Sequence, residues 1–129
     1  MKEVMAFIRM NKVNQTKEAL NTAGFPSVTC RKVLGRGKKK VEYSVALLPE
    51  SHQEAAKEAP ILAETISEEH RLIPKRFLTL VVRDDEVERA IDAIMAVNST
   101  GNPGDGKIFI LPIAEAYRVR TGETGEEAI

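Results

Sequence analysis

The sequence predicts an α+β domain, an antiparallel sheet with two helices on one face, which is the ferredoxin-like sandwich. Two observations support this class. Strand-like and helix-like patterns alternate in the order strand, helix, strand, strand, helix, strand, with one long excursion between the second and third strands. The chain has 129 residues, a usual length for one domain, so we expect a single domain over residues 1–129.

The first strand, helix and strand occupy the N-terminal quarter. Residues 2–10 alternate as a strand that is apolar on both faces, and residues 11–24 follow helical spacing up to Gly24, where a left-handed C-terminal residue belongs. Residues 27–35 predict a second strand, in which Cys30 is expected to be a small buried side chain. A single cysteine excludes an internal disulfide and a multi-cysteine metal site.

A long excursion then interrupts the pattern. Residues 35–74 open with glycines and a run of lysines and continue without sustained periodicity. An excursion of this length inside a compact domain is usually functional.

The second half repeats the first in outline. Residues 75–83 predict a third strand and residues 84–99 the clearest helix, which Asp84 or Asp85 can cap, with Asp85 and Glu88 as a capping-box pair. One stripe of this helix is apolar except at its end. The stripe consists of Val87, Ile91, Ile94, Met95 and Asn98.

The last segments are a strand over residues 107–113, a short strand over 116–120 and an acidic, turn-forming tail. Two helices cover only one face of such a sheet, yet the first strand is apolar on both sides. We therefore expect the uncovered face to pack against copies of the chain in a closed oligomer.

Composition makes some classes of partner and location unfavourable. The 19 basic and 19 acidic residues cancel and aromatic residues make up only 5%, which disfavours a nucleic-acid partner. No stretch approaches the length of a membrane span and the N-terminus lacks a signal-peptide pattern, so we expect a cytoplasmic protein.

The stretch TGNPGDGK, residues 100–107, concentrates three glycines before a lysine. Glycines let backbone N–H groups converge on an anion, and the lysine adds a positive charge. It is not a nucleotide-hydrolysing P-loop, because Ile108 stands where Ser or Thr should hold magnesium and a strand follows instead of a helix. On these residues alone, an anion nest and a plain connection remain equally open.

Two further basic groups favour the anion. Arg118 and Arg120 alternate on one face of the short strand and suit bidentate phosphate contact, although salt bridges to the acidic tail would also explain them. The segment GRGKKK, residues 35–40, again sets glycine beside cations. Together the three clusters favour a polyphosphate ligand, a nucleotide in particular. No catalytic constellation accompanies them.

These motifs resemble a known family. The stretch TGNPGDGKIFILPIAEAYRVRTGETGEEAI is similar to the C-terminal part of the PII (GlnB-like) signal-transduction proteins, where a glycine loop TGxxGDGKIFV precedes an RxRTGE segment. The strand KEVMAFIR and the VLGRG approach to the excursion are also similar, and only about residues 41–72 fail to match. Two separated motifs in the same order make the resemblance specific.

The resemblance implies a trimer that binds ATP or ADP between subunits, binds 2-oxoglutarate with Mg-ATP, and docks on targets through a T-loop, here about residues 37–74. By position it implies that the nucleotide contacts Thr29, Gly35, Gly37, Lys38, Val81, Gly104, Asp105, Gly106, Lys107, Arg118 and Arg120. Arg118 and Arg120 would act from the neighbouring subunit, and Thr29 and the Val81 backbone would lie at the adenine. For 2-oxoglutarate it implies Lys39, Lys40 and Lys75, with Lys75 on a carboxylate.

At one position the sequence departs from the family pattern in a way that bears on magnesium binding. Lys39 stands where the family usually has a Gln whose amide oxygen binds magnesium, and an ammonium has no lone pair for a cation. The usual metal-bridged 2-oxoglutarate site lacks that ligand, unless Lys39 contacts the acid directly. The chain most resembles the nitrogen-fixation subgroup, which pairs with a second PII-like subunit and binds dinitrogenase.

We therefore predict a PII-type regulator, not an enzyme, that binds ATP or ADP and 2-oxoglutarate between subunits. Its T-loop would control a nitrogen-metabolism target, nitrogenase in particular. The alternative is a small trimeric enzyme or a metal-binding protein on the same fold, unrelated to nitrogen control.

Overall fold

A computed structural model describes residues 1–37 and 72–129. The chain divides into two compact units, one formed by Met1–Val33 with Lys75–Ile129 and the other by Leu34–Pro74. The predictions for Lys38, Lys39, Lys40 and most of the T-loop lie outside the described residues.

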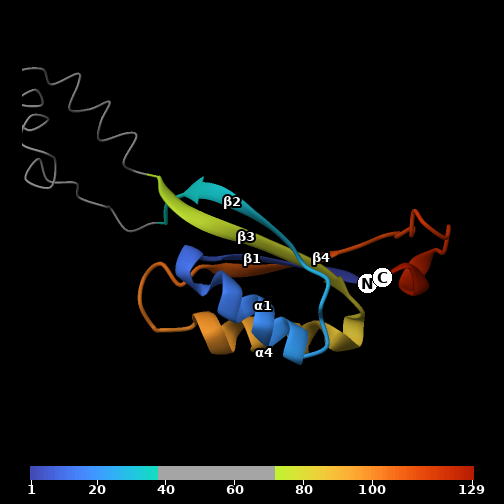
Figure 1. Cartoon of the computed structure of the whole chain (residues 1–129), viewed down its shortest axis with the longest axis horizontal. Coiled ribbons are helices and arrows are strands. Elements are labelled where there is room, and N and C mark those ends of the chain that lie inside the picture. The colour runs from blue at the N-terminus through green and yellow to red at the C-terminus, as the bar shows by residue number, and fades with distance from the viewer. Residues whose placement is uncertain (38–71) are drawn as a thin grey trace, which may run out of the picture. The chain divides into compact units, whose positions relative to one another are not determined.

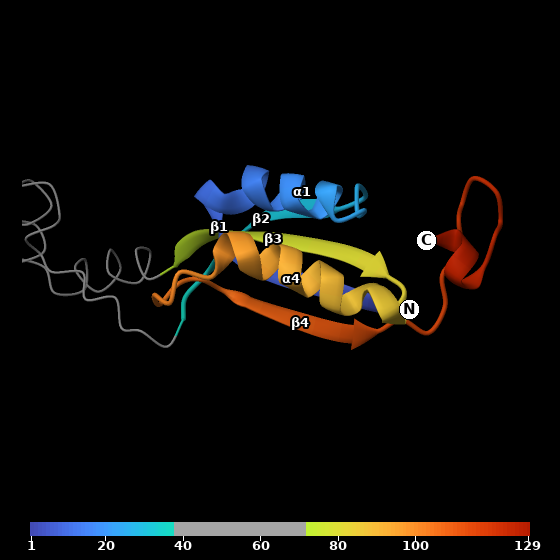
Figure 2. The ribbon, with the colours of Figure 1, turned by 90° about the horizontal axis from the view of Figure 1, so that it is seen from below.

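The predicted order of elements is confirmed. The strands are β1 (Lys2–Arg9), β2 (Thr29–Gly35), β3 (Ile73–Val82) and β4 (Lys107–Pro112), and the helices are α1 (Val13–Thr22) and α4 (Val87–Asn98). The four strands form one sheet in the order β2-β3-β1-β4, and β1 pairs antiparallel with both β3 and β4. Both helices lie on the same face of this sheet (Figures 1 and 2), so the fold is the ferredoxin-like sandwich.

The core lies between the sheet and the two helices. Alternate residues of β1 face the helices, and each pairs with an apolar residue of β3: Val4 with Leu80 and Ala6 with Leu78, all at most 4% exposed. Leu20 of α1 and Ile94 of α4 pack against them. The buried cluster is thus mainly aliphatic, as expected from a chain with few aromatic residues, and Phe25 is its one aromatic member among the described residues.

The first helix ends as its sequence predicts. Gly24 has a φ of 95° and its N–H donates to the Asn21 carbonyl, while the Phe25 N–H donates to the Leu20 carbonyl. This pair of bonds is a Schellman motif, which requires the left-handed conformation that glycine adopts without strain.

The start of the second helix differs from the prediction. Asp85 and Glu88 do not form the capping-box pair; the Glu86 carboxylate accepts instead from the Arg83 backbone N–H at 3.0 Å, and a short 3-10 turn precedes α4. Asp84 accepts from the N-terminal amine of Met1 at 2.9 Å, and this bond lowers the pKa of Asp84. The acidic run follows β3 directly. Its carboxylates on Asp84 and Glu86 therefore accept hydrogen bonds from Met1 and Arg83, which precede the helix.

The buried face of α4 differs in part from the apolar stripe predicted for this helix. Its buried residues are Ala90, Ile94 and Asn98, whereas Met95 is 48% exposed. Met95 and Ile91 line a groove of about 360 Å³ between α4 and β4. Cys30, predicted to be buried, is only half-buried in β2.

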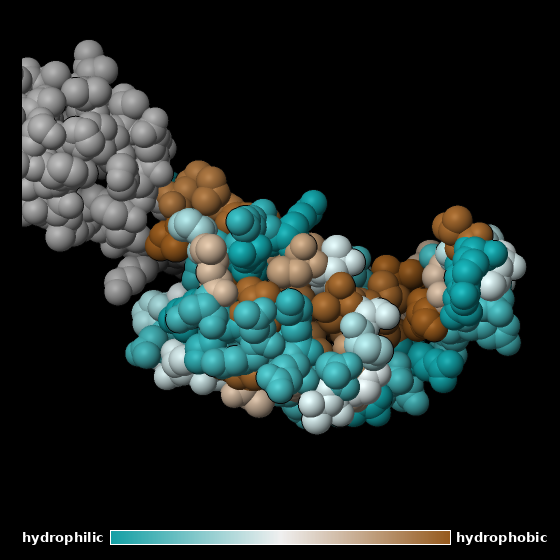
Figure 3. Space-filling model, in the orientation of Figure 1, coloured by the Kyte–Doolittle hydropathy of each residue, from teal (hydrophilic) through white to brown (hydrophobic). Residues whose placement is uncertain are grey.

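The helix-free face of the sheet is apolar in part, as the first strand predicts, and the same register also places on it Glu3, Arg9, Lys75, Thr79 and Lys107. Phe7 lies at its centre with ring centroids 5.1 Å from Phe77 and 6.2 Å from Phe109. The pairing register places on this face Met5, Phe7, Phe77, Val81, Phe109 and Leu111. Figure 3 shows hydrophilic residues gathered over the helices and hydrophobic residues in the band beside them, where the strands run.

The segment after β4 is not a strand. In residues 116–120 only Tyr117 forms an isolated bridge, with Thr124, and the chain turns back on itself at Arg118. Val119 is fully exposed. The period-two pattern in AYRVR therefore does not mark a sheet strand, because the segment lies beyond the end of β4 and pairs with no strand of residues 1–37 or 72–112 (Figure 1).

Among the described residues, no helix is long and apolar enough to cross a membrane.

Candidate functional site

The glycine loop connects α4 to β4 and lies directly on β1. Gly104 and Gly106 have φ of 101° and 104°. A Cβ atom at Gly106 would stand 1.7 Å from the Phe7 carbonyl oxygen, which no side chain can do. Gly106 is therefore required by the close approach of two backbones, a need that is structural before it is functional.

Asp105 organises the loop from inside. One carboxylate oxygen accepts from the backbone N–H groups of Thr100 at 2.7 Å and Gly101 at 2.9 Å, and the other accepts from the Thr100 hydroxyl. These bonds, led by the Thr100 hydroxyl, hold the pKa of Asp105 well below its usual range. Two backbone N–H groups of the loop, which could have bound an anion, thus donate to Asp105 instead.

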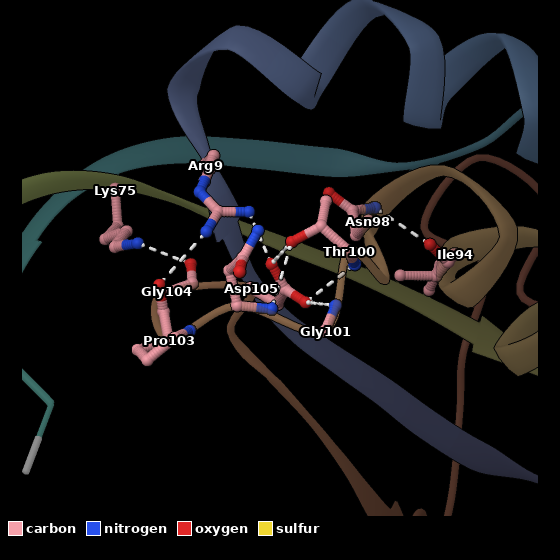
Figure 4. A network of polar contacts seen from close by, with 10 residues as sticks. Arg9, Lys75, Ile94, Asn98, Thr100, Gly101, Pro103, Gly104 and Asp105 are labelled. Carbon is pink, nitrogen blue, oxygen red and sulfur yellow. Dashed lines mark hydrogen bonds and ion pairs between the residues drawn. The ribbon is translucent and has the colours of Figure 1, made fainter.

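Arg9 holds the loop from outside. Its guanidinium donates from Nη1 to the Asp105 carboxylate at 2.5 Å and from Nη2 to the Pro103 carbonyl at 3.1 Å (Figure 4). Arg9 is not among the site residues predicted from the sequence, because its partner lies 96 positions away along the chain. The one available signal is a charge that ends the apolar run of residues 4–8.

Lys75 completes the clamp. Its ammonium donates to the Gly104 carbonyl at 2.8 Å (Figure 4), and Lys75 pairs with Arg9 across β1 and β3. Burial and the positive charge of Arg9 lower the pKa of Lys75, while Asp105 opposes this shift. The residue that the resemblance assigns to 2-oxoglutarate therefore lies beside the loop that it assigns to phosphates.

Among the described residues of the predicted nucleotide set, Lys107 adjoins the loop, whereas Val81 lies far from it. Lys107 begins β4 opposite Phe7, at the loop end of the sheet. Val81 pairs with Glu3, near the other end of β1, and lies six positions along β3 from Lys75, about 20 Å. Thr29 is exposed at the start of β2.

Arg118 also lies at the end of the sheet opposite the loop. The segment that carries it follows β4, whose last residue Pro112 pairs with Lys2, whereas the loop enters β4 where Lys107 pairs with Phe7. Figure 1 shows the loop and the C-terminal segment at opposite ends of the sheet. Arg118 and the glycine loop of the same chain cannot contact one phosphate chain.

Arg118 is engaged by its own segment. Its Nη1 donates to the Glu123 carboxylate at 2.5 Å and its Nη2 to the Glu127 carbonyl at 2.9 Å. This is the salt bridge to the acidic tail that the sequence offered as the alternative to a phosphate contact. Any anion that binds Arg118 has to compete with Glu123.

Gly35 and Gly37, the two glycines at the start of the excursion, can be judged by the atoms that lie around them. A Cβ atom at Gly35 or Gly37 would meet no atom within 4 Å. Packing within the described residues therefore does not require glycine at these two positions.

Fold and site together define a class: a small α+β protein with a clamped, glycine-rich loop at one end of its sheet and a basic segment at the other. Within that class the chain belongs to the PII family, because the family model described as nitrogen regulatory protein P-II matches residues 1–123. Members of this family are signal-transduction regulators. The chain is therefore a nitrogen regulator and not an enzyme, which excludes the alternative of an enzyme or metal-binding protein unrelated to nitrogen control.

Relatives named for a nitrogen fixation nifHD region match nearly the whole chain. It is 47% identical to the nitrogen fixation nifHD region GlnB-like protein 2 of Methanothermococcus thermolithotrophicus, covering 100% of this chain and 98% of the relative. It is 43% identical to the protein of the same name from Methanobacterium ivanovii, covering 100% and 99%. The GlnB-like protein 1 of the first organism is 39% identical, covering 97% and 99%.

A solved structure shares the fold. The crystal structure of Arabidopsis thaliana PII bound to citrate superimposes with a TM-score of 0.70 at 30% identity and covers 98% of this chain and 87% of that one.

Proposed function

We propose that the chain binds ATP and ADP at the boundary between two copies of itself and controls a nitrogen-metabolism target, nitrogenase in particular, through residues 37–74 acting as the T-loop. One observation carries the site: the glycine loop and the basic C-terminal segment lie at opposite ends of the same sheet. A phosphate chain can reach both only if the second comes from another subunit.

The helix-free face supplies the reason for another subunit. An exposed apolar cluster around Phe7 and Phe109 is costly in water, and packing it against another copy of the chain would remove it from water. We propose a closed trimer, either of this chain alone or mixed with a second PII-like subunit. The GlnB-like proteins 1 and 2 of one archaeon support the mixed form.

The phosphates would bind the outer side of the loop. In the described part of the chain, the N–H groups of Gly104 and Gly106 take no part in a hydrogen bond outside the regular elements, and Lys107 follows them. Gly35, Gly37 and Lys38 would add contacts from the base of the T-loop. Thr29 and the Val81 backbone would hold the adenine.

The acid effector would bind beside the phosphates. Lys75 adjoins the loop and its ammonium has two further protons to donate, so a dicarboxylate such as 2-oxoglutarate could pair with it, with Lys39 and Lys40 as further cations. The citrate bound by the Arabidopsis PII structure supports a carboxylate ligand on this fold.

The described residues do not fit a protein-bound magnesium. They contain no group of three His, Cys, Asp or Glu side chains that could hold a metal ion. Asp105, the one carboxylate of the loop, has its oxygens engaged by Arg9, Thr100 and Gly101. Any Mg²⁺ would arrive on the triphosphate.

Ligand binding would act on the target by shifting the populations of two T-loop states. ATP, ADP and the acid would bind two states of the T-loop with different affinities and so change the fraction able to dock. The nifHD-region names of the relatives support dinitrogenase as the target, and we place this action in the cytoplasm.

Titration calorimetry with ATP, ADP and 2-oxoglutarate on the purified oligomer tests the proposal. We expect micromolar binding of both nucleotides, and tighter binding of the acid when ATP is present. Failure of both nucleotides to bind would overturn it.

A further inference from the structure

Three bonds fasten the glycine loop to the sheet, and two of them come from one side chain. Arg9 contacts the Asp105 carboxylate and the Pro103 carbonyl, while Lys75 contacts the Gly104 carbonyl. We propose that Arg9 and Asp105 form a positioning couple, in which Arg9 sets the shape of the nucleotide loop through Asp105 and does not touch the nucleotide. This inference rests on the proposed nucleotide site and adds to it a residue outside the contact set.

Asp105 has the wrong charge for a phosphate contact. Its carboxylate is ionised, because the hydrogen bonds that it accepts hold its pKa well below the usual range. A phosphate beside it would be repelled. Its oxygens point instead to the N–H groups of Thr100 and Gly101, which places the turn between α4 and Gly104.

Arg9 is engaged in the same way. Its charge is balanced by Asp105, its second Nη atom is bonded to Pro103, and its side chain is only 27% exposed. A guanidinium fixed as a planar fork between a carboxylate and a carbonyl has little freedom to turn toward a ligand. It is suited to hold a shape.

The loop needs to be held. Three of its residues, Gly101, Gly104 and Gly106, have positive φ, and glycine loses more conformational freedom on ordering than any other residue. Ordering the loop only when the nucleotide arrives would weaken binding, whereas a clamp that orders it beforehand avoids that loss.

Calorimetry on the full-length oligomer tests the couple with ATP and ADP as ligands. We expect Arg9→Met to weaken both nucleotides about tenfold and to about the same extent, the size of one charge-assisted hydrogen bond. Arg9→Lys keeps the charge beside Asp105 and should recover part of the loss. Lys17→Met removes an exposed cation from α1 and is the matched control, expected to change nothing.

The double variant shows whether Arg9 acts through Asp105. In the Asp105→Asn background, Arg9→Met should add less than a threefold further loss, because the partner is already gone. Additive losses would overturn the proposal. A loss confined to ATP would also overturn it, since it would mean that Arg9 touches the terminal phosphate.

A ligand-free measurement separates this inference from the proposed function. Amide resonances of Thr100 and Gly101 should shift in Arg9→Met without nucleotide, while those of α1 stay in place. If they do not move, the couple does not shape the loop. If the wild-type chain binds no nucleotide but these resonances shift, the proposed function fails and the structural couple stands.

Discussion

The glycine loop and the C-terminal segment are both predicted from sequence to bind phosphate, yet they are built in opposite ways. The loop lies on β1 and is bonded to distant parts of the chain, at Arg9 and Lys75. The C-terminal segment bonds mainly to itself, through Arg118, Glu123 and Glu127. One half of the proposed site is thus shaped by bonds to distant parts of the chain, whereas the other half is a cation held by a local carboxylate.

The largest expected effect is a loss of stability at Gly106, where a close backbone contact requires glycine, compared with Gly101, where the described residues make no such contact. Gly106→Ala should destabilise the fold by about 3 kcal/mol or more, because the new Cβ would overlap the Phe7 carbonyl at positive φ. Gly101→Ala, also at positive φ but in open space, should cost only about 1 kcal/mol. Thermal unfolding compares the two, and equal costs would refute the close approach.

The second prediction concerns the division of the site between subunits. Lys107→Ala and Arg118→Ala should each weaken ATP by about tenfold or more and leave the trimer intact. When the two variants are unfolded and refolded together, mixed trimers contain boundaries with both native residues. Calorimetry should then recover a fraction of tight sites. No recovery, with mixed trimers shown by mass spectrometry, would place both residues on one chain's site.

A smaller effect is expected from the carboxylate that holds Arg118. Glu123→Gln removes its charge, so ATP no longer competes with it and should bind up to about fivefold more tightly, the range of an exposed ion pair. The effect should shrink in high salt. Glu126→Gln is the matched control. Weaker binding in Glu123→Gln would mean that Glu123 instead positions Arg118.

The smallest effect is a pH dependence in the loop. Because the folded-state pKa of Asp105 is depressed, its stabilising contribution is present above the ordinary carboxyl range and is lost as pH falls through the folded-state value. The melting temperatures of the wild type and Asp105→Asn should therefore differ at pH 6 and converge in acid. A constant difference across this range would contradict the ionised, bonded carboxylate.

Local patterns predicted most of the fold. The alternation in β1, the helical spacing of α1 and α4 and the glycine at the end of α1 each depend on neighbours a few residues away, and each is confirmed. The short strand over residues 116–120 is wrong for a physical reason. Alternation describes which way side chains point, but a strand also needs a partner, and the described residues of the chain place none beyond the end of β4.

The sequence by itself determined the order of elements, the family motifs and the residue types of the proposed anion site. Only the tertiary structure decided their roles. It turned Asp105 inward, brought Arg9 and Lys75 to the loop, and set Arg118 at the far end of the sheet with Glu123. The reason is that hydrogen bonds between residues up to 96 positions apart depend on strand register and chain packing, which no local pattern encodes.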